Sequence, residues 1–316
     1  MKAMILAAGL GTRLRPLTDT RPKALVEINN RTLLEITLTR LRTFGVTEAI
    51  VNVHHFADMV ALYLKSKNNF GMRIEISRED DQLLDTGGGL KKAAWFFQEN
   101  SPLSSSSSKT SVVSDEPFVL HNADVLSTID LTAMLQFHVE HQALATLAVQ
   151  SRPSSRQLLF NDQLQLSGRR ISGQDSVILS GAKNPGTHVS QPANLETTKS
   201  SSDSPLAYPE PRGATRLPRA PRGHSFTPSP EGPLPPSKEP SPLLPLAFSG
   251  IHILSPHLLP QLTETGPFSI IDSYLRLSSQ GQKILAFRHD HSYWRDLGKP
   301  ADLAQAALDL QKNIFS

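Results

Sequence analysis

The stretch AAGLGTRLRPLTDTRPKALVEI, residues 7–28, follows directly after the short apolar run MKAMIL. Gly9 and Gly11 allow a sharp turn and a close approach of a ligand to the backbone. Arg13 adds a planar guanidinium fork and Lys23 a point charge, and both groups suit phosphate oxygens. The stretch therefore predicts a strand that ends in a phosphate-binding loop. The alternative is a basic surface loop with solvated charges, which this clustering disfavours.

Two familiar phosphate-binding loops do not match this stretch. A P-loop requires G-x-x-x-x-G-K-[ST], which is absent here. A dinucleotide-binding loop requires G-x-G-x-x-G and an acidic residue about 20 positions later, at the end of the next strand. Leu14 stands in place of the third glycine, and a second loop and a helix follow. A dehydrogenase is therefore only a runner-up.

Apolar patterns after this loop alternate between strand and helix up to residue 150. Strands are predicted at 2–8, 48–55, 72–79, 117–125 and 143–150, and helices at 32–45, 57–67, 90–99 and 129–142. A further strand is predicted at 246–254, and further helices at 270–281 and 300–312. This order indicates crossover connections with helices on both faces of a sheet. The predicted fold is an α/β three-layer sandwich around a mixed, mostly parallel sheet.

Two segments interrupt this pattern. Residues 101–116 are rich in serine and predict a flexible loop insertion. Residues 173–245 hold 15 of the 24 prolines, and such a composition buries too little apolar surface to offset its ordering entropy. They therefore predict a disordered insertion. The remaining segments, 1–172 and 246–316, are predicted to form one discontinuous domain.

Composition and charge exclude several classes of protein. The chain has no cysteine, which excludes disulfides and thiolate metal sites. The net charge of +3 is too small to predict a nucleic-acid partner, for which a clustered basic face would be expected. No apolar run reaches the length of about 18 residues that a membrane span needs. The opening apolar run is too short for a signal peptide, so a cytoplasmic protein is expected.

Two further motifs carry carboxylates. LHNADV, residues 120–125, places Asp124 directly after an apolar run, at the end of a predicted strand where open α/β sheets bind ligands. Its oxygens suit Mg²⁺, which binds carboxylates and substrate phosphates. Capping of the next helix is an equally good explanation of Asp124. YWRDLGKP, residues 293–300, contains Asp296, for which a turn is the plain alternative.

Glycines and histidines form two weaker patterns. LLDTGGGLKKA, residues 83–93, places three glycines before a predicted helix, where they allow close approach to a flat ligand. A flexible helix entry is the alternative. His138 and His141 stand one helical turn apart without a nearby third ligand, so they are expected on a helix surface rather than in a zinc site.

LAAGLGTRLRPLTDTRPKALVEI, residues 6–28, together with the three later motifs, resembles the signature of the sugar-1-phosphate nucleotidyltransferases. The resemblance covers residues 1–172 and 246–312. It implies a Mg²⁺-dependent enzyme that joins an NTP to a sugar 1-phosphate, releases pyrophosphate and serves nucleotide-sugar synthesis for cell-envelope polysaccharide. Uridylyltransferases for N-acetylmuramate 1-phosphate and guanylyltransferases for mannose 1-phosphate are both similar, so UTP and GTP stay open.

The resemblance also implies roles for individual residues. Arg13, Lys23 and Asp124 would be catalytic, and Asp124 with Asp296 would hold the metal. The nucleotide would contact Ala8, Gly9, Gly11, Thr12, Arg13, Lys23, Thr86, Gly87, Gly88 and Asn122, and the sugar phosphate would contact Arg156, Ser249 and Gly250. The chain has Ala123 and Asp85 where the family often has other residues. A lysine that many relatives direct at the sugar phosphate has no clear counterpart, and Arg169 and Arg170 are the nearest cations.

A protein that senses nucleotide sugars or scaffolds a partner, without catalysis, is the alternative of another class. The proline-rich segment 173–245 is suited to binding a partner. Such a relative would be expected to lose Asp124, Asp296 or Lys23, and all three are present. No hexapeptide repeat of a left-handed β-helix is visible near the C-terminus, so a bifunctional acetyltransferase is not expected.

Overall fold

The computed structural model describes residues 1–98, 115–171, 177–179 and 242–312. The chain divides into two units, and all of these residues lie in the first, Met1–Ala182 with Ser241–Ser316. The predicted insertions at 101–116 and 173–245 fall almost wholly outside the described residues. The loop and the disordered segment expected there therefore stay predictions.

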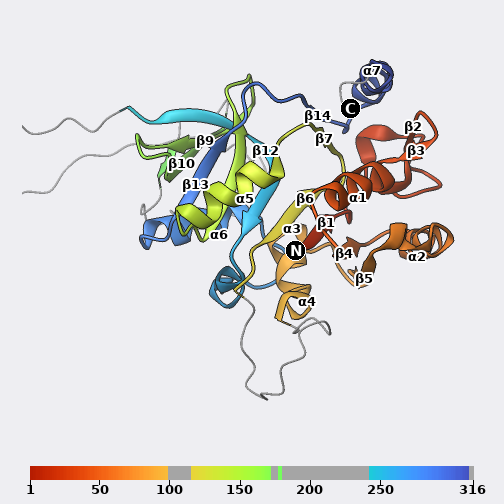
Figure 1. The fold of residues 1–316 in the computed structure, drawn as a ribbon, viewed down its shortest axis with the longest axis horizontal. Coiled ribbons are helices and arrows are strands. Elements are labelled where there is room, and N and C mark those ends of the chain that lie inside the picture. The colour runs from red at the N-terminus through yellow and green to blue at the C-terminus, as the bar shows by residue number, and fades with distance from the viewer. Residues whose placement is uncertain (99–114, 172–176, 180–241, 313–316) are drawn as a thin grey trace, which may run out of the picture. The chain divides into compact units, whose positions relative to one another are not determined.

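Ten strands form the central sheet of the described part of the chain. They are β1 (Lys2–Leu6), β4 (Glu48–Val53), β5 (Arg73–Arg78), β6 (Phe118–Asn122), β8 (Ala145–Gln150), β9 (Arg156–Phe160), β10 (Leu166–Ile171), β11 (Val177–Leu179), β12 (Leu244–Leu254) and β13 (Ile284–Arg288). The order is β11-β10-β9-β12-β6-β1-β4-β5, and β8 pairs with both β12 and β13 (Figure 1). Strands β6, β1, β4 and β5 are parallel, whereas β12 runs antiparallel to β6. The mixed sheet expected from the sequence is confirmed.

The helices surround this sheet. They are α1 (Leu33–Thr43), α2 (Ala57–Ser66), α3 (Asp85–Lys92), α4 (Trp95–Gln98), α5 (Leu131–Glu140), α6 (Ile270–Ser279) and α7 (Pro300–Gln311). Side-chain oxygens of Thr32, Asp130 and Ser269 accept hydrogen bonds from the first backbone N–H groups of α1, α5 and α6, which explains why these helices begin there. None of the described helices has the length and apolar character needed to cross a membrane.

Short elements complete the fold near the loops. Four 3₁₀ turns are described, namely η1 (Thr12–Leu14), η2 (Lys23–Leu25), η3 (Asn68–Gly71) and η4 (Pro256–Gln261). Two small ribbons pair β2 (Glu27–Ile28) with β3 (Arg31–Thr32), and β7 (Val125–Ser127) with β14 (Trp294–Asp296). These ribbons and α7 share a third apolar cluster that includes Leu14, Ile28, Leu297 and Leu303.

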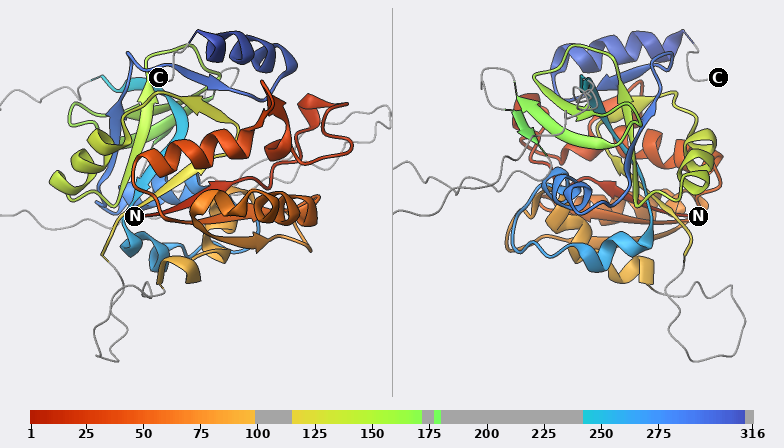
Figure 2. Two further views of the ribbon diagram at one scale, coloured as in Figure 1. Left: turned by 45° about the vertical axis from the view of Figure 1, so that its right-hand side comes forward. Right: turned by 90° about the vertical axis from the view of Figure 1, so that its left-hand side faces the viewer.

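Successive side chains of the parallel strands point to opposite faces, so each strand contributes to two cores. Met4 and Leu120 pack on one face, against residues of α3, α4 and α6. Ile5 and Val119 pack on the other face, against residues of α1, α2 and α5. Helices therefore cover both faces (Figure 2), and the predicted three-layer sandwich is confirmed.

The sequence suggested that the glycine run forms a loop before a helix, but the structure does not have this loop. The run lies inside α3, and the helix expected at 90–99 is instead two helices, α3 and α4. A β-carbon on Gly87 would lie 2.3 Å from the ring of Phe268, and one on Gly89 would lie 2.7 Å from Asn52 Nδ2. The glycines therefore let α3 pack directly on its neighbours, which outweighs their low helix propensity.

The expectation that His138 lies on the surface is wrong. His138 is 2% exposed, and its Nδ1 lies 2.9 Å from Oγ1 of Thr146 on β8. Helix α5 turns this histidine toward the sheet, whereas His141 one turn later is exposed as expected. Within the described ranges, no group of three or more His, Cys, Asp or Glu side chains could hold a metal ion.

Buried histidines should make the protein less stable in acid. Burial lowers the pKa of His138 to about 4 and that of His252 to about 3. The unfolded chain, with a histidine pKa of about 6.5, binds more protons below that pH, so stability is full above it and falls toward pH 4. Each such histidine should lower the free energy of unfolding by about 1.4 kcal/mol for every pH unit below about 6.5, down to its pKa in the folded protein. The free energy of unfolding, measured with denaturant at several pH values, should depend less steeply on pH in His138→Asn than in the wild type. An equally steep dependence on pH would contradict this role of His138.

Candidate active site

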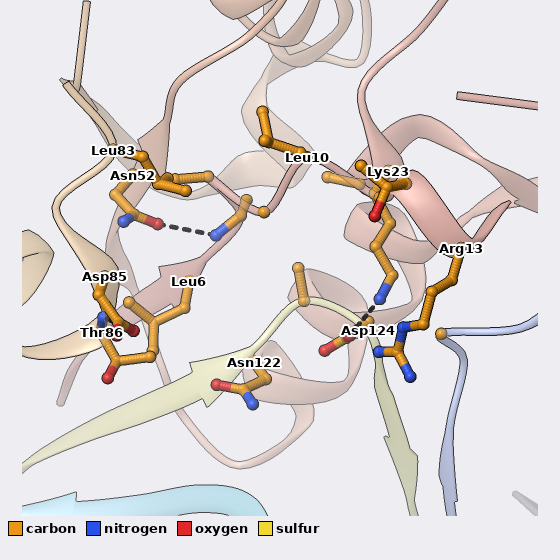
Figure 3. A pocket seen from close by; sticks show the side chains of 18 of the residues that line it. Leu6, Leu10, Arg13, Lys23, Asn52, Leu83, Asp85, Thr86, Asn122 and Asp124 are labelled. Carbon is orange, nitrogen blue, oxygen red and sulfur yellow. Dashed lines mark hydrogen bonds and ion pairs between the residues drawn. The ribbon is translucent and has the colours of Figure 1, made fainter. Parts of the chain in front are cut away.

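A pocket of about 600 Å³ lies at the carboxyl ends of β1, β4 and β6. Residues 6–13, from the end of β1 into the glycine loop, form one wall, and residues 122–124, at and just after the end of β6, form another. Asn52, near the end of β4, and Gly298 also contribute (Figure 3). Open α/β sheets bind ligands at this edge, where successive strand ends converge.

The glycine loop has a defined shape. Gly11 has a φ of +64°, a conformation that glycine adopts without strain. Its carbonyl oxygen accepts hydrogen bonds from Leu14 N at 2.8 Å and from Thr18 Oγ1 at 2.9 Å. Upstream, the N–H of Ala7 donates to Oδ1 of Asn52 at 2.7 Å. Both ends of the loop are therefore anchored by side chains, and its middle lines the pocket.

Cations and a carboxylate meet at one end of the pocket. Lys23 stands at the first position of η2, and its Nζ donates to Oδ2 of Asp124, which follows β6. Both side chains are mostly buried. Figure 3 shows the guanidinium of Arg13 beside this pair. The arrangement brings together the three residues that the sequence assigned to catalysis, and it is suited to binding phosphate oxygens.

Asp296 reaches this same end on the ribbon β7–β14. It pairs in register with Val125, and the next amide, Leu297 N, donates to the carbonyl oxygen of Asp124 at 2.8 Å. A β-carbon on Gly298 would lie 2.6 Å from both Asp296 Oδ1 and Arg13 Nη2. Asp296 itself does not line the pocket, but it packs directly behind Gly298, which does.

The two carboxylates have a donor set that fits a divalent cation. One oxygen of Asp124 is bonded to Lys23, and one oxygen of Asp296 accepts the N–H of Gly298 at 2.7 Å. Each carboxylate thus keeps a second oxygen for a ligand. Mg²⁺ commonly takes only one or two protein carboxylates and completes its shell with phosphates and water, so two such oxygens would be enough protein ligands for it.

The opposite end of the pocket is formed by Asn52, Leu83, Asp85, Thr86 and Pro267. Asp85 opens α3 with a φ of +58°, and Thr86 Oγ1 accepts the N–H of Ile270 at 3.0 Å. Figure 3 shows Asn52, Leu83, Asp85 and Thr86 on the side away from Lys23 and Asp124. One end of the pocket is therefore cationic, whereas the other mixes apolar and hydrogen-bonding groups.

Most residues assigned to nucleotide binding from the sequence line this pocket. They are Ala8, Gly9, Gly11, Thr12, Arg13, Lys23, Thr86 and Asn122, together with Asp124. Gly87 and Gly88 do not line it, because they are buried in α3. A β-carbon on Gly88 would lie 2.8 Å from the carbonyl oxygen of Gly266, so this glycine serves packing.

The residues assigned to the sugar phosphate do not line the pocket. Arg156 is exposed at the start of β9. Ser249 is fully buried in β12, with its Oγ 2.8 Å from Nε2 of His289. Gly250 packs behind Asn122, where a β-carbon would lie 2.8 Å from Nδ2 of that side chain. Arg169, another cation considered for this role, pairs with Asp272.

Arg152 lies against the strand that carries Asp296. Its guanidinium stacks on the ring of Trp294 at 3.6 Å, and its Nη2 donates to the carbonyl oxygen of Phe248 at 2.8 Å. Burial lowers the pKa of Arg152, and the nearby charge of Asp296 acts in the opposite direction. The arginine is therefore packed within the fold rather than solvated.

Sequence reasoning assigned no role to Asn52, Leu83 or Pro267, although Leu83 opens the glycine-containing motif 83–93. Asn52 had a usable signal, because it interrupts an otherwise apolar strand near its carboxyl end, beside the strand that precedes the glycine loop. Leu83 and Pro267 carry no comparable signal, since they reach the pocket through loops.

Comparison with known proteins relates this chain to one family. The family described as "Nucleotidyl transferase" matches residues 2–158. The chain is 54% identical over 99 residues to an N-acetylmuramate alpha-1-phosphate uridylyltransferase of Caulobacter vibrioides, which covers 31% of this chain and 41% of that protein. It is 32% identical over 199 residues to mannose-1-phosphate guanyltransferase beta-B of Xenopus laevis, covering 62% of this chain and 51% of that protein. The chain thus spans about half the length, or less, of these relatives.

Solved structures share the fold. A UDP-glucose pyrophosphorylase complexed with UDP-glucose matches with a TM-score of 0.62 and 16% identity, covering 98% of each chain. An inositol-1-phosphate CTP transferase from T. maritima matches with a TM-score of 0.61 and 14% identity, covering 99% of this chain and 95% of that one. At such identities the likeness establishes the architecture alone.

Proposed function

We propose, since residues 2–158 belong to the nucleotidyl transferase family, that this chain transfers a nucleotidyl group from an NTP to a sugar 1-phosphate. The observation that carries the proposal is the convergence of the glycine loop, Arg13, Lys23 and Asp124 at one end of a single pocket. An oxygen of the sugar phosphate attacks the α-phosphorus. The bond from that phosphorus to the leaving oxygen breaks, and pyrophosphate departs as the nucleotide sugar forms.

The cationic end of the pocket would serve this step by placing two polyanions together. Arg13 and the N–H groups of the glycine loop would bind the β- and γ-phosphates that become pyrophosphate. Lys23, which Asp124 holds at the junction of loop and sheet, would contact the α-phosphate. Positioning and charge stabilisation supply most of the catalysis in phosphate transfer of this kind, so no covalent nucleophile is required.

Asp124 and Asp296 would hold Mg²⁺ through their remaining oxygens. The bound ion supplies charge neutralisation between the two reacting phosphates. The protein's own part is to bring both carboxylates to the pocket end, which it does by joining Leu297 N to the carbonyl oxygen of Asp124. Gly298 adds to this by letting Arg13 and Asp296 pack against one backbone position.

The opposite end of the pocket would receive the nucleoside. With the triphosphate on the glycine loop, the base and ribose extend toward Leu83, Asp85 and Thr86. Leu83 offers an apolar surface to a flat base, while Asp85 and Thr86 carry groups that can hydrogen bond to hydroxyls or to base edges. Residues assigned to the nucleotide from the sequence thus span both ends.

UTP and N-acetylmuramate 1-phosphate are the substrates that we propose. Two relatives with that printed activity support this choice, one at 54% identity over 99 residues and one from Neisseria meningitidis at 38% over 136 residues. GTP and mannose 1-phosphate are the second candidate, because the guanyltransferase match is longer, at 199 residues.

Pyrophosphate release with a panel of substrates tests this choice. The full chain is incubated with Mg²⁺ and each of UTP, GTP, CTP and ATP, against N-acetylmuramate 1-phosphate, mannose 1-phosphate and glucose 1-phosphate. We expect the highest kcat/KM for UTP with N-acetylmuramate 1-phosphate. A higher kcat/KM for GTP with mannose 1-phosphate would show that the second candidate pair, and not the first, is the correct one. Nucleotide binding without pyrophosphate release would favour a non-catalytic sensor or scaffold.

A further inference from the structure

Glu79 is a buried carboxylate that lies behind the pocket. It directly follows β5, is 1% exposed, and donates its backbone N–H to the carbonyl oxygen of Val53 at 2.7 Å. Burial of a carboxylate is costly unless its oxygens are hydrogen bonded. Both are: Oε1 accepts from Nδ2 of Asn52 at 2.7 Å, and Oε2 accepts from the N–H of Leu84 at 2.9 Å.

Asn52 extends this contact to the glycine loop. Its Oδ1 accepts the N–H of Ala7 at 2.7 Å while its Nδ2 is bonded to Glu79. Glu79 and Asn52 therefore form a bridge between the backbone at Ala7 and the backbone at Leu84. Ala7 belongs to the wall that residues 6–13 form, and the neighbours of Leu84, Leu83 and Asp85, also line the pocket. Figure 3 shows Leu83 and Asp85 on the side away from Lys23 and Asp124.

Helix α3 packs directly on this bridge. A β-carbon on Gly89 would lie 2.7 Å from Asn52 Nδ2 and 2.7 Å from Glu79 Oε1. No side chain can be added at this position without moving one of the two groups. Glycine is therefore required at position 89 to make room for the bridge, and not for contact with a nucleotide.

We propose that Glu79 is a positioning residue that sets the separation between the glycine loop and the start of α3, through Asn52 and the N–H of Leu84. This separation fits the nucleoside end of the pocket to the NTP, so the proposal rests on the proposed function. Only a group with two acceptors can bond the Asn52 amide and the Leu84 N–H together, because Asn52 Oδ1 already serves Ala7.

Glu79→Gln exchanges one of these acceptors for a donor. The new NH₂ group of the glutamine must then point either at Nδ2 of Asn52 or at the N–H of Leu84. In either case two hydrogen-bond donors face each other, and both are left without an acceptor. We expect the Kd for the NTP to rise about 10-fold or more, because one buried hydrogen bond of the bridge is lost. The KM for the sugar 1-phosphate should change little, since the cationic end keeps its contacts.

Asn52→Asp should weaken NTP binding to a similar extent, because it places the new carboxylate of residue 52 against the carboxylate of Glu79. Combining Asn52→Asp with Glu79→Gln should restore binding. In the double variant the aspartate can accept from Ala7 N–H and from the new amide, whose oxygen can accept from Leu84 N–H. The buried charge and the volume are unchanged, so rescue would report the hydrogen-bond pattern alone.

Glu48→Gln is the matched control. Glu48 lies at the amino end of β4, and its Oε2 accepts from Arg73 Nη1 at 2.8 Å. The residue does not line the pocket. The same substitution there should lower stability slightly and leave the Kd for the NTP at the wild-type value.

Calorimetric titration of the full chain with UTP and GTP, together with hydrogen exchange at Ala7 and Leu84, tests the proposal. We expect weaker binding and faster exchange in each single variant, and near wild-type values in the double variant. Unchanged binding and exchange in folded Glu79→Gln, or a double variant no better than the single ones, would overturn it. Should Glu79→Gln fail to fold, Asn52→Asp and the double variant still decide. A wild-type chain that binds no NTP would contradict the proposed function, whereas exchange at the two amides still reports the bridge.

Discussion

Asp124→Asn is expected to lower kcat by about 100- to 1,000-fold or more, the loss that follows removal of one electrostatic contact at a reacting centre. The asparagine removes the charge that pairs with Lys23 and one of the two carboxylates proposed to hold Mg²⁺. The fold should be unaffected, because the side chain keeps its shape and the bond from Leu297 N is made to the backbone of residue 124. Steady-state kinetics and circular dichroism measure the two effects.

Asp272→Asn supplies the control for this loss. Asp272 pairs with Arg169 outside the pocket, and its side chain is half exposed. This variant should retain the kcat of the wild type. A folded Asp124→Asn protein with near-normal kcat would contradict the role proposed for Asp124. The same account requires that a chelator stops the reaction and that added Mg²⁺ restores it.

Gly11→Val is expected to lower kcat/KM by about 100-fold or more, because misplacing a positioning group by about 1 Å can cost that much. The φ of +64° is strained for a β-branched residue. A β-carbon would also lie 2.9 Å from Thr18 Cγ2 and 3.1 Å from Lys23 Cβ, so the loop and Lys23 must shift. Kinetics with varied NTP would show the loss mainly as a raised KM.

Gly281→Val separates backbone strain from the effect on the site. Gly281 has a φ of +83° and no neighbour within 4 Å of a β-carbon, and it lies outside the pocket. This substitution should lower the melting temperature while kcat/KM stays at the wild-type value. An equal loss of kcat/KM in both variants would mean that strain, and not the displacement of Lys23, explains the Gly11→Val result.

The parallel half of the fold could be predicted because its signals are local. The apolar run before Gly9 and the apolar run before Asp124 each form a strand, and both end at the pocket. Strands β13 and β14 could not be predicted in this way. Strand β14 has only three residues, whereas β13 is as long as β1, and both pair with strands that are distant in sequence, β7 and β8 respectively. Such pairing leaves no periodic pattern in the sequence.

Local reasoning failed where packing outweighs propensity. Three glycines favour a loop when read alone, yet Gly87 and Gly89 lie in helix α3. Glycine is needed at both positions because a larger residue would collide with Phe268 or Asn52. His138 was expected on the surface because it stands one helical turn from His141 without a nearby third ligand, but α5 turns it toward Thr146. Both errors concern tertiary contacts that no short window of sequence contains.

The cationic end of the pocket was easier to predict than the opposite end. Arg13 and Lys23 belong to one continuous motif, and Asp124 follows a clear apolar strand. The end proposed for the nucleoside depends on single residues from separate elements, such as Asn52, whose Oδ1 accepts the hydrogen bond of the Ala7 N–H. Isolated polar residues of this kind become recognisable only when the strand ends are placed side by side.

The phosphorus balance of the reaction tests the central claim most directly. ³¹P NMR would follow the full chain with Mg²⁺, UTP and N-acetylmuramate 1-phosphate, and then with GTP and mannose 1-phosphate. The account predicts that, with one of these pairs, one nucleotide sugar and one pyrophosphate form for each NTP and sugar phosphate consumed, and that neither forms without Mg²⁺. Release of inorganic phosphate in place of pyrophosphate, or bound NTP with no turnover of either pair, would contradict it.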